Sequence, residues 1–361
     1  MHHTHGRVVD VTSLADLDRR LEAGARSLAG WRVTGLDLRQ HGPALGAVDV
    51  AQSLFLGCTF APPDEESVRR RGAVVLPRLS GMPIDTYRST LYSPRDLYDT
   101  PAYAHSLDAR AYAWSQRAPD HDDALAQALH DHSIDQVLSA WVRDRSIVGV
   151  MGGHALKRGS AGYAEAARLG RLLAQRGLTV ATGGGPGAME AANLGAFLSA
   201  EPDSALDSAL GSLAAVPSFN PDIGAWAALA FDVIDAHSPG VDSLGIPTWH
   251  YGHEPPNPFA TAIAKYVRNA TREAVLLEVC NAGIVFLAGA GGTVQEIFQD
   301  ACENYYADES SLAPMVLVGV EHWTVTVPAW PLLSSLARGR AMEPHVHLVD
   351  TVAEAVAVLA P

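Results

Sequence analysis

Two apolar segments with the pattern of buried strands each run directly into a glycine-rich turn that opens a helix. Leu178–Thr182 leads into the turn Gly183–Gly187, and Ile284–Leu287 leads into the turn Gly289–Thr293. Glycine lets the backbone adopt positive φ and approach a ligand closely, and the amide groups at a helix N-terminus attract anions. Neither turn has the dinucleotide spacing G-x-G-x-x-G, and neither has the Lys-Ser/Thr pair of a P-loop. The sequence therefore predicts a phosphate site, but not a standard NAD or ATP site.

The segments around these turns alternate between strand and helix patterns. Ile147–Met151 precedes a helical pattern over Ala161–Gln175, and two further strand patterns, Met315–Val318 and His345–Val349, precede a closing helix over Val352–Leu359. Short strands that alternate with helices are typical of crossover units and a parallel sheet. We therefore expect an α/β fold, namely a Rossmann-like doubly wound parallel sheet.

Domain boundaries follow from where this alternation holds. We place the nucleotide-binding domain at residues 121–361, with an insertion at about 200–260 whose aromatic and polar residues suggest a lid or substrate loop. Residues 1–120 form a β-leaning accessory region of unknown role. Strand patterns such as Trp31–Thr34 are separated there by turn residues, and Pro62-Pro63-Asp64 is interpreted as a break.

Charge and cysteine content narrow the partners and the compartment. The net charge is −14, with 40 acidic against 26 basic residues, which disfavours nucleic acid and anionic membranes as partners. The three cysteines show no metal spacing and fit a reducing cytosol, and no apolar run follows Met1–His5, so we expect a cytoplasmic protein without a signal peptide. His250 and His253 lack a third ligand at metal spacing, and we expect no metal site.

The two turns and their flanking residues resemble the LONELY GUY family, whose members are often mistaken for lysine decarboxylases. The resemblance rests on Ala166–Ala174 and Gly183–Asn193, and on Ala288–Glu296, which stands where the family has P-G-G-x-G-T-x-x-E. It covers roughly residues 145 to 330. Ala288 and Ala290 replace the proline and the second glycine of the family turn.

This resemblance implies an activity. Such proteins hydrolyse the N-glycosidic bond of nucleoside 5′-monophosphates to free base and ribose 5-phosphate. Within the family, the chain most resembles the longer bacterial nucleosidases, which act on ordinary purine and pyrimidine monophosphates. An AMP-like ligand, no cofactor, and a homodimer or higher homo-oligomer are implied. The alternative is a non-catalytic nucleotide-binding sensor that keeps the pocket, motivated by the altered turn.

The resemblance also implies site residues. Those expected to bind phosphate or nucleotide come from the two turns and the helices that follow: Gly183, Gly184, Gly185, Gly187, Glu190, Gly289, Gly291, Gly292 and Thr293. Glu296 is the expected catalytic carboxylate, which would stabilise an oxocarbenium-like sugar and orient or deprotonate water. Arg272 would pair with the phosphate or hold Glu296 in place. The family spacing leaves Arg268, one turn earlier, as an alternative arginine.

Each of these residues also has a purely structural interpretation. Glu296 can be a helix N-terminal acid, worth about 0.3–1 kcal/mol, Arg272 a solvated arginine, and Thr293 an ordinary N-cap. Glu190 either binds ribose hydroxyls or supports its helix. Lower-ranked pocket residues are His154, Met189 and Asn257, of which Met189 is expected to pack in the core.

Overall fold

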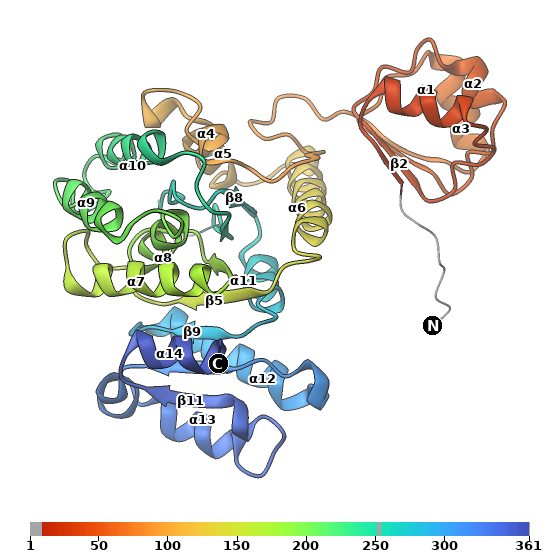
Figure 1. The fold of residues 1–361 in the computed structure, drawn as a ribbon. Helices are drawn as coiled ribbons and strands as arrows, with labels where there is room; N and C mark the ends of the chain where they lie inside the picture. The colour runs from red at the N-terminus through yellow and green to blue at the C-terminus, as the bar shows by residue number, and fades with distance from the viewer. Residues whose placement is uncertain (1–8, 251–253, 361) are drawn as a thin grey trace. The chain divides into compact units, whose positions relative to one another are not determined.

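The computed structural model describes residues 9–250 and 254–360 (Figure 1). The expectation about Met1–His5 lies outside these residues, and so does His253. Contacts between Cα atoms divide the chain into two compact units, the first of residues 1–89 with 119–133 and the second of residues 90–118 with 134–361. No helix among the described residues is long and apolar enough to cross a membrane.

The first unit contains a parallel sheet of four strands in chain order. Its strands are β1 (Val9–Val11), β2 (Trp31–Thr34), β3 (Leu54–Leu56) and β4 (Val74–Leu76). One helix lies in each connection: α1 (Leu14–Glu22), α2 (Gly42–Gly46) and α3 (Pro62–Arg70). Trp31–Thr34 is thus a strand as expected, whereas β1 and the helices α2 and α3 were not expected from the sequence.

Successive strands of this unit are repeats of one another. Val33 pairs with Phe55 and Phe55 pairs with Val75, so the register advances by 22 and then by 20 residues. The residues that precede the strands, Gly30, Gln52 and Gly72, all have positive φ, at 76°, 61° and 91°. Gly30 N donates to Gln52 O at 3.0 Å and Gln52 N donates to Gly72 O at 3.1 Å. The first unit is therefore a short solenoid, in which each repeat stacks on the next.

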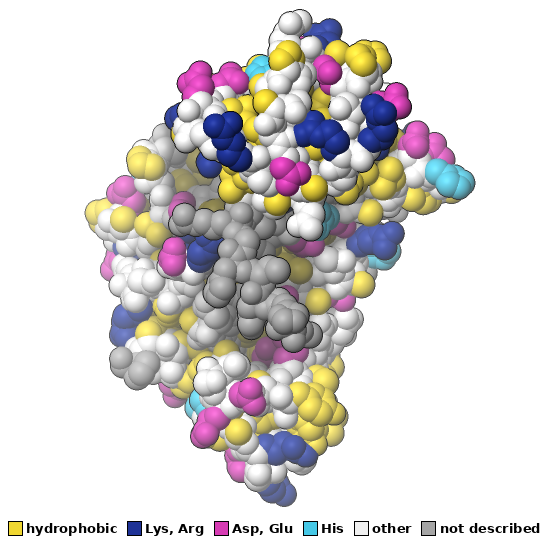
Figure 2. Space-filling view, turned by 90° about the vertical axis from the view of Figure 1, so that its right-hand side faces the viewer, with side chains coloured by type: hydrophobic (Ala, Val, Ile, Leu, Met, Phe, Trp, Pro, Cys, Tyr) yellow, Lys and Arg dark blue, Asp and Glu magenta, His cyan; other side chains and the backbone are white. Residues whose placement is uncertain are grey.

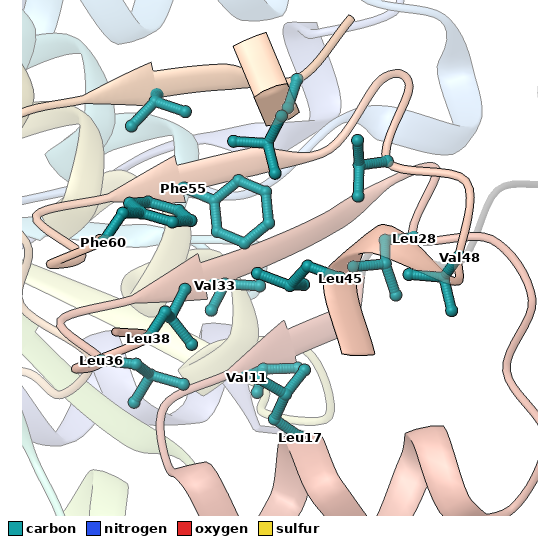
Figure 3. Packing of buried hydrophobic residues seen from close by; sticks show 14 residues of the cluster. Val11, Leu17, Leu28, Val33, Leu36, Leu38, Leu45, Val48, Phe55 and Phe60 are labelled. Carbon is teal, nitrogen blue, oxygen red and sulfur yellow. The ribbon is translucent and has the colours of Figure 1, made fainter. Parts of the chain in front are cut away.

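One hydrophobic core runs through the solenoid (Figure 3). Val33 and Phe55 from the strands meet Leu17 from α1 and Leu45 from α2, and all four side chains are almost fully buried. The segment Pro62-Pro63-Asp64, interpreted as a break, is the first turn of α3. Proline is tolerated there because the first amide groups of a helix have no partner within it.

Charged side chains of both signs lie on helices α1 and α3 of this unit. Asp16 pairs with Arg19 and Arg20 on α1, and Glu65 pairs with Arg69 on α3. The face of the molecule drawn in Figure 2 likewise carries Asp and Glu side chains interspersed with Lys and Arg. Such exposed pairs contribute at most about 1 kcal/mol each, so the buried core dominates the stability of the solenoid.

The second unit contains a parallel sheet of seven strands in the order β11-β10-β9-β5-β6-β7-β8. The strands are β5 (Ile147–Met151), β6 (Thr179–Thr182), β7 (Leu244–Gly245), β8 (Ala262–Ile263), β9 (Ile284–Phe286), β10 (Met315–Val318) and β11 (Val346–Val349). Chain order runs outward from β5 in one direction, returns at β9, and continues in the other direction. The expected Rossmann-like doubly wound sheet is confirmed.

Helices cover both faces of this sheet. Val148 and Val150 of β5 point to the face covered by α7 (Ala161–Gln175), α8 (Ala188–Phe197) and α14 (Val352–Leu359). Gly149 between them faces the other way, and a side chain there would meet Cys280 just after α11 (Asn269–Glu278). Helix α12 (Gly291–Tyr306) contacts both α11 and α13 (Ala329–Ala337).

The remaining elements are helical. The insertion holds α9 (Asp203–Leu213) and α10 (Ile223–His237), whose apolar side chains join those of α8 in one core, so much of it is regular structure rather than an open loop. Helices α4 (Pro94–Leu97), α5 (Leu107–Ser115) and α6 (His121–Trp141) precede β5. Short 3-10 turns cover Tyr103–His105, Glu309–Ser311 and Glu343–His345, and a π turn covers His322–Thr326.

A buried ion pair ties residues 90–118 to the rest of the second unit. The carboxylate of Asp108 on α5 lies 2.6 Å from Nζ of Lys265 and accepts a hydrogen bond from Nε1 of Trp249 at 2.8 Å. Asp108 and Lys265 are 2% and 1% exposed. This segment was expected to belong to the accessory region 1–120, whereas its contacts place it with the seven-stranded unit.

Candidate functional site

The point where the strand order reverses lies between β5 and β9, with β6 on the other side of β5. Ligands of doubly wound sheets bind at the carboxyl ends of the strands near this point. Gly152 follows β5 with a φ of 94°, and a Cβ there would lie 3.3 Å from the methyl group of Thr293. The loop after β5 and the second glycine turn therefore meet at the reversal point.

The first turn requires glycine at two positions. Gly184 and Gly187 have φ values of 72° and 76°. A Cβ at Gly187 would also collide with the carbonyl oxygens of Gly153 and His154. The turns after β5 and β6 thus pack directly against each other through their backbones, and His154 itself is exposed beside them.

A buried amide network fixes the first turn. Nδ2 of Asn257 donates to the carbonyl of Gly185 at 3.1 Å and to Oδ1 of Asn193 at 3.2 Å. The hydroxyl of Thr182 donates to the same Asn193 oxygen at 2.7 Å and accepts from the amide of Gly184 at 3.0 Å. Asn257 is fully buried. The structure thus places this lower-ranked candidate behind the turn, as a support for it.

The second turn leaves the N-terminus of α12 open. Ala290 is the N-cap residue and makes no side-chain cap, so Thr293 is not the N-cap. A Cβ at Gly291 or Gly292 would meet nothing within 4 Å. Ala290 has a φ of −117°, which any residue adopts, so this position does not require the glycine of the family motif. The exposed amide groups and the helix dipole can accept an anion here.

Arg272 connects the first turn to the neighbouring strand end. Its Nε donates to the carbonyl of Ile246 at 2.7 Å, and its Nη2 donates to the carbonyl of Gly183 at 3.4 Å. It lies on α11 and is partly buried, which differs from the solvated arginine of the structural interpretation. Arg268 is exposed and stands just before the first residue of α11.

Glu296 lies near this arginine on α12. Burial raises the pKa of its carboxyl group to about 7, while the positive charge of Arg272 lowers it and the negative charge of Glu273 raises it further. Glu273 accepts a hydrogen bond from Gln295 at 2.7 Å, which ties α11 to α12 beside the acid. A carboxyl group with a pKa near neutrality can accept and return a proton.

Glu190 sits in a second buried ion pair. Nε of Arg158 donates to its Oε1 at 3.0 Å, and both side chains are 1% exposed. The guanidinium also lies 4.5 Å from the ring centroid of Trp226 and donates to its carbonyl at 2.9 Å. Burial raises the pKa of Glu190 against the effect of Arg158. These contacts match the helix-supporting role of Glu190.

Met189 lies at the first turn. Its Sδ is 2.9 Å from the position that a Cβ on Gly183 would take, and its Cε is equally close to that position on Gly185. It is partly buried. The thioether therefore forms an apolar wall against these two glycines.

Two residues near the turns are not among the site residues expected from the sequence. Oε2 of Glu254 lies 3.5 Å from the position of a Cβ on Gly185, and Nε2 of His322 lies 3.0 Å from the carbonyl oxygen of Gly289. Glu254 lies directly before a Pro-Pro-Asn-Pro run, and this run is a sequence signal that could have pointed to it as a site residue. His322 carries no such signal, because it follows a different strand from the turn that it contacts.

A cavity of about 320 Å³ adjoins the second turn on the face covered by α7 and α14. Its walls include Leu287 and Ala288 at the end of β9, Val318 at the end of β10, and Val352 at the start of α14. These walls are mostly apolar. A ligand on the second turn would thus have apolar surface beside it as well as open amide groups.

Comparison with known proteins gives a family match for one part of the second unit. Residues 145–200, from β5 through the first turn and α8, match the model of the SLOG cluster4 family. No curated protein matches the chain. The match covers much less than half of the sequence, and the LONELY GUY family itself stays a prediction.

Solved structures with a similar chain trace include two molybdenum cofactor proteins. The carrier protein from Chlamydomonas reinhardtii is 20% identical, with a TM-score of 0.37, and the match covers 60% of this chain and 99% of that one. The binding protein from Rippkaea orientalis is 16% identical, with a TM-score of 0.37 and coverage of 60% and 96%. Likeness at this level carries no argument about the ligand or the activity of this chain.

Proposed function

We propose that the second unit binds nucleoside 5′-monophosphates and hydrolyses their N-glycosidic bond to free base and ribose 5-phosphate. The observation that carries the proposal is the position of Arg272, hydrogen-bonded to Gly183 of the first turn and electrostatically coupled to Glu296 beyond the second. A cation between the first turn and a near-neutral carboxyl group just beyond the second turn suits a substrate that spans both turns and has a phosphate next to its reacting centre.

The phosphate is assigned to the second turn. The open amide groups of Gly291 and Gly292 lie at the positive end of the α12 dipole, and no Cβ obstructs them. The first turn has the Glu254 carboxylate near Gly185, which would repel a phosphate and suits the hydroxyl or amino groups of a nucleoside. The nucleotide would then run from α12 toward the first turn, past Arg272.

Glu296 is assigned as the general base. Its carboxylate takes a proton from water, the water oxygen bonds to C1′, and the C1′–N bond breaks with its electron pair passing to the base. A proton from the site or solvent neutralises the departing base. The negative carboxylate also stabilises the positive charge that develops on the sugar in the transition state. Its pKa of about 7 leaves a substantial ionised fraction at neutral pH.

The test is incubation of the purified chain with a panel of nucleoside 5′-monophosphates, with free base and ribose 5-phosphate measured by chromatography. Glu296→Gln should leave the Kd for AMP nearly unchanged and abolish release of ribose 5-phosphate. Glu303→Gln, two turns further along α12, is the matched control and should retain activity. If Glu296→Gln hydrolyses AMP like the parent, the assignment of the base is wrong.

The panel also separates an enzyme from a sensor. Release of free base from at least one monophosphate, lost in Glu296→Gln, supports hydrolysis. Tight binding without turnover across the whole panel would instead support a non-catalytic nucleotide-binding protein, in which Arg272 and the open turn serve binding alone.

A further inference from the structure

The second glycine turn is contacted by the side chain of His322, which lies in the π turn after β10. Nε2 of His322 lies 3.0 Å from the carbonyl oxygen of Gly289 and 3.3 Å from its amide nitrogen. In one tautomer the ring donates to the carbonyl, and in the other it accepts from the amide. In either tautomer, one imidazole nitrogen holds the backbone of Gly289 just before α12 begins.

His322 itself stands on a rigid base. It follows β10, and its ring packs edge-on against the ring of Trp323, with centroids 4.6 Å apart. Trp323 is fully buried and its Nε1 donates to the carbonyl of Val318 at 3.0 Å. The carbonyl of His322 accepts from the amide of Val327 at 2.7 Å, which closes the π turn. The ring is therefore held in a fixed position relative to the sheet.

The turn that it contacts is rich in glycine and carries no side-chain cap at Ala290. The side chain of Thr293 packs close to Gly289, whereas a Cβ on Gly291 or Gly292 would meet nothing within 4 Å. Glycine has the largest backbone freedom of any residue, so ordering such a turn around an anion costs conformational entropy. A contact that orders it beforehand improves anion binding by reducing that cost.

We propose that His322 is a positioning residue, which pre-orders the turn Gly289–Gly292 so that the amide groups of α12 face the phosphate. The inference rests on the proposed function only for the identity of the anion. His322 acts through the backbone of Gly289 and not on the reacting atoms. Its loss should therefore raise KM and Kd together and leave kcat largely unchanged.

The first readout is independent of any ligand. Amide hydrogen exchange of the segment 288–297 in the full-length protein should be roughly 3- to 10-fold faster in His322→Ala than in the parent. His322→Gln, whose amide can occupy the position of Nε2, should restore slow exchange. Thr324→Val is the matched control, because it removes a hydrogen bond to Val320 O within the same π turn without touching Gly289.

The second readout is AMP binding by calorimetry. His322→Ala should weaken the Kd roughly 3- to 10-fold, His322→Gln should recover it, and Thr324→Val should keep the parent value. Unchanged exchange in His322→Ala overturns the inference, even if the parent hydrolyses AMP. Faster exchange in a chain whose parent binds no monophosphate upholds the positioning role and rejects the proposed function.

Discussion

The guanidinium of Arg272 donates from Nε to the carbonyl of Ile246 at 2.7 Å, which anchors the α11 side chain at the carboxyl end of β7. That bond fixes the cation where it lowers the pKa of Glu296. The arginine thus has both a positional and an electrostatic effect, and the two can be separated by substitution.

Replacing Arg272 should move the pH dependence of hydrolysis. The pKa of Glu296 is about 7 with Arg272 opposing its rise, so Arg272→Met should raise it further and shift the ascending limb of kcat/KM to higher pH. Arg272→Lys keeps the charge and should shift it less. Profiles between about pH 5 and 9 with AMP measure this, and a limb that stays in place in Arg272→Met contradicts the coupling.

Ionisation of the Glu296 carboxyl group should lower the stability of the folded chain as the pH rises. Its folded-state pKa is raised from 4.5 to about 7, so the folded chain holds the proton more tightly than the unfolded chain. Stability is therefore lost as the pH rises from 4.5 through 7, and Glu296→Gln removes this loss. In urea unfolding the variant should be more stable than the parent by roughly 1–3 kcal/mol at pH 8 and about equal near pH 4. A variant that is less stable at pH 8 would contradict the assigned burial.

The Arg158–Glu190 pair should stabilise the fold and not contact the ligand. Glu190→Gln leaves the Arg158 charge buried and unpaired, which costs about 3–5 kcal/mol in similar pairs. The double variant Arg158→Met with Glu190→Leu removes both charges and should recover much of this loss. Denaturation curves together with AMP titrations decide the matter. A Glu190→Gln protein of normal stability that binds AMP poorly would favour ribose contact instead.

Gln52 offers a stabilising substitution in the solenoid. It has a φ of 61° at a position where the neighbouring repeats have Gly30 and Gly72. Left-handed backbone is costly for residues with a Cβ, so Gln52→Gly should raise the free energy of unfolding by about 0.5–1 kcal/mol. Gln52→Ala keeps the Cβ and should give no such gain. Equal stability of the two variants would show that this φ carries no strain.

The sequence predicts the elements of the second unit where local patterns are strong. The bounds of β5 and α7 agree with the expected Ile147–Met151 and Ala161–Gln175, because a buried apolar run and a helical period are each visible within their own residues. Both glycine turns also lie at strand ends as expected. The two-residue strands β7 and β8 and the helices of the insertion have weaker local patterns and were missed.

The site depends on relationships that local patterns do not contain. Family spacing left Arg268 and Arg272 open, and the contact of Arg272 with Ile246, 26 residues away, distinguishes their surroundings. Glu190 finds Arg158 across 32 residues, and His322 reaches Gly289 across 33. Each pair is brought together by the order of strands in the sheet. The solenoid repeat was missed because only Gly30 and Gly72 keep the glycine that marks it, whereas Gln52 does not.

The ion pair of Asp108 and Lys265 has a consequence for synthesis on the ribosome. Asp108 leaves the exit tunnel well before its partners, with Trp249 following 141 residues later. During that interval α5 has neither the lysine that neutralises its carboxylate nor the indole that donates a hydrogen bond to it in the native fold. Nascent chains that end before Trp249 should therefore leave residues 90–118 accessible to proteases, and arrest-peptide or limited-proteolysis profiles should show protection only after Lys265 has emerged.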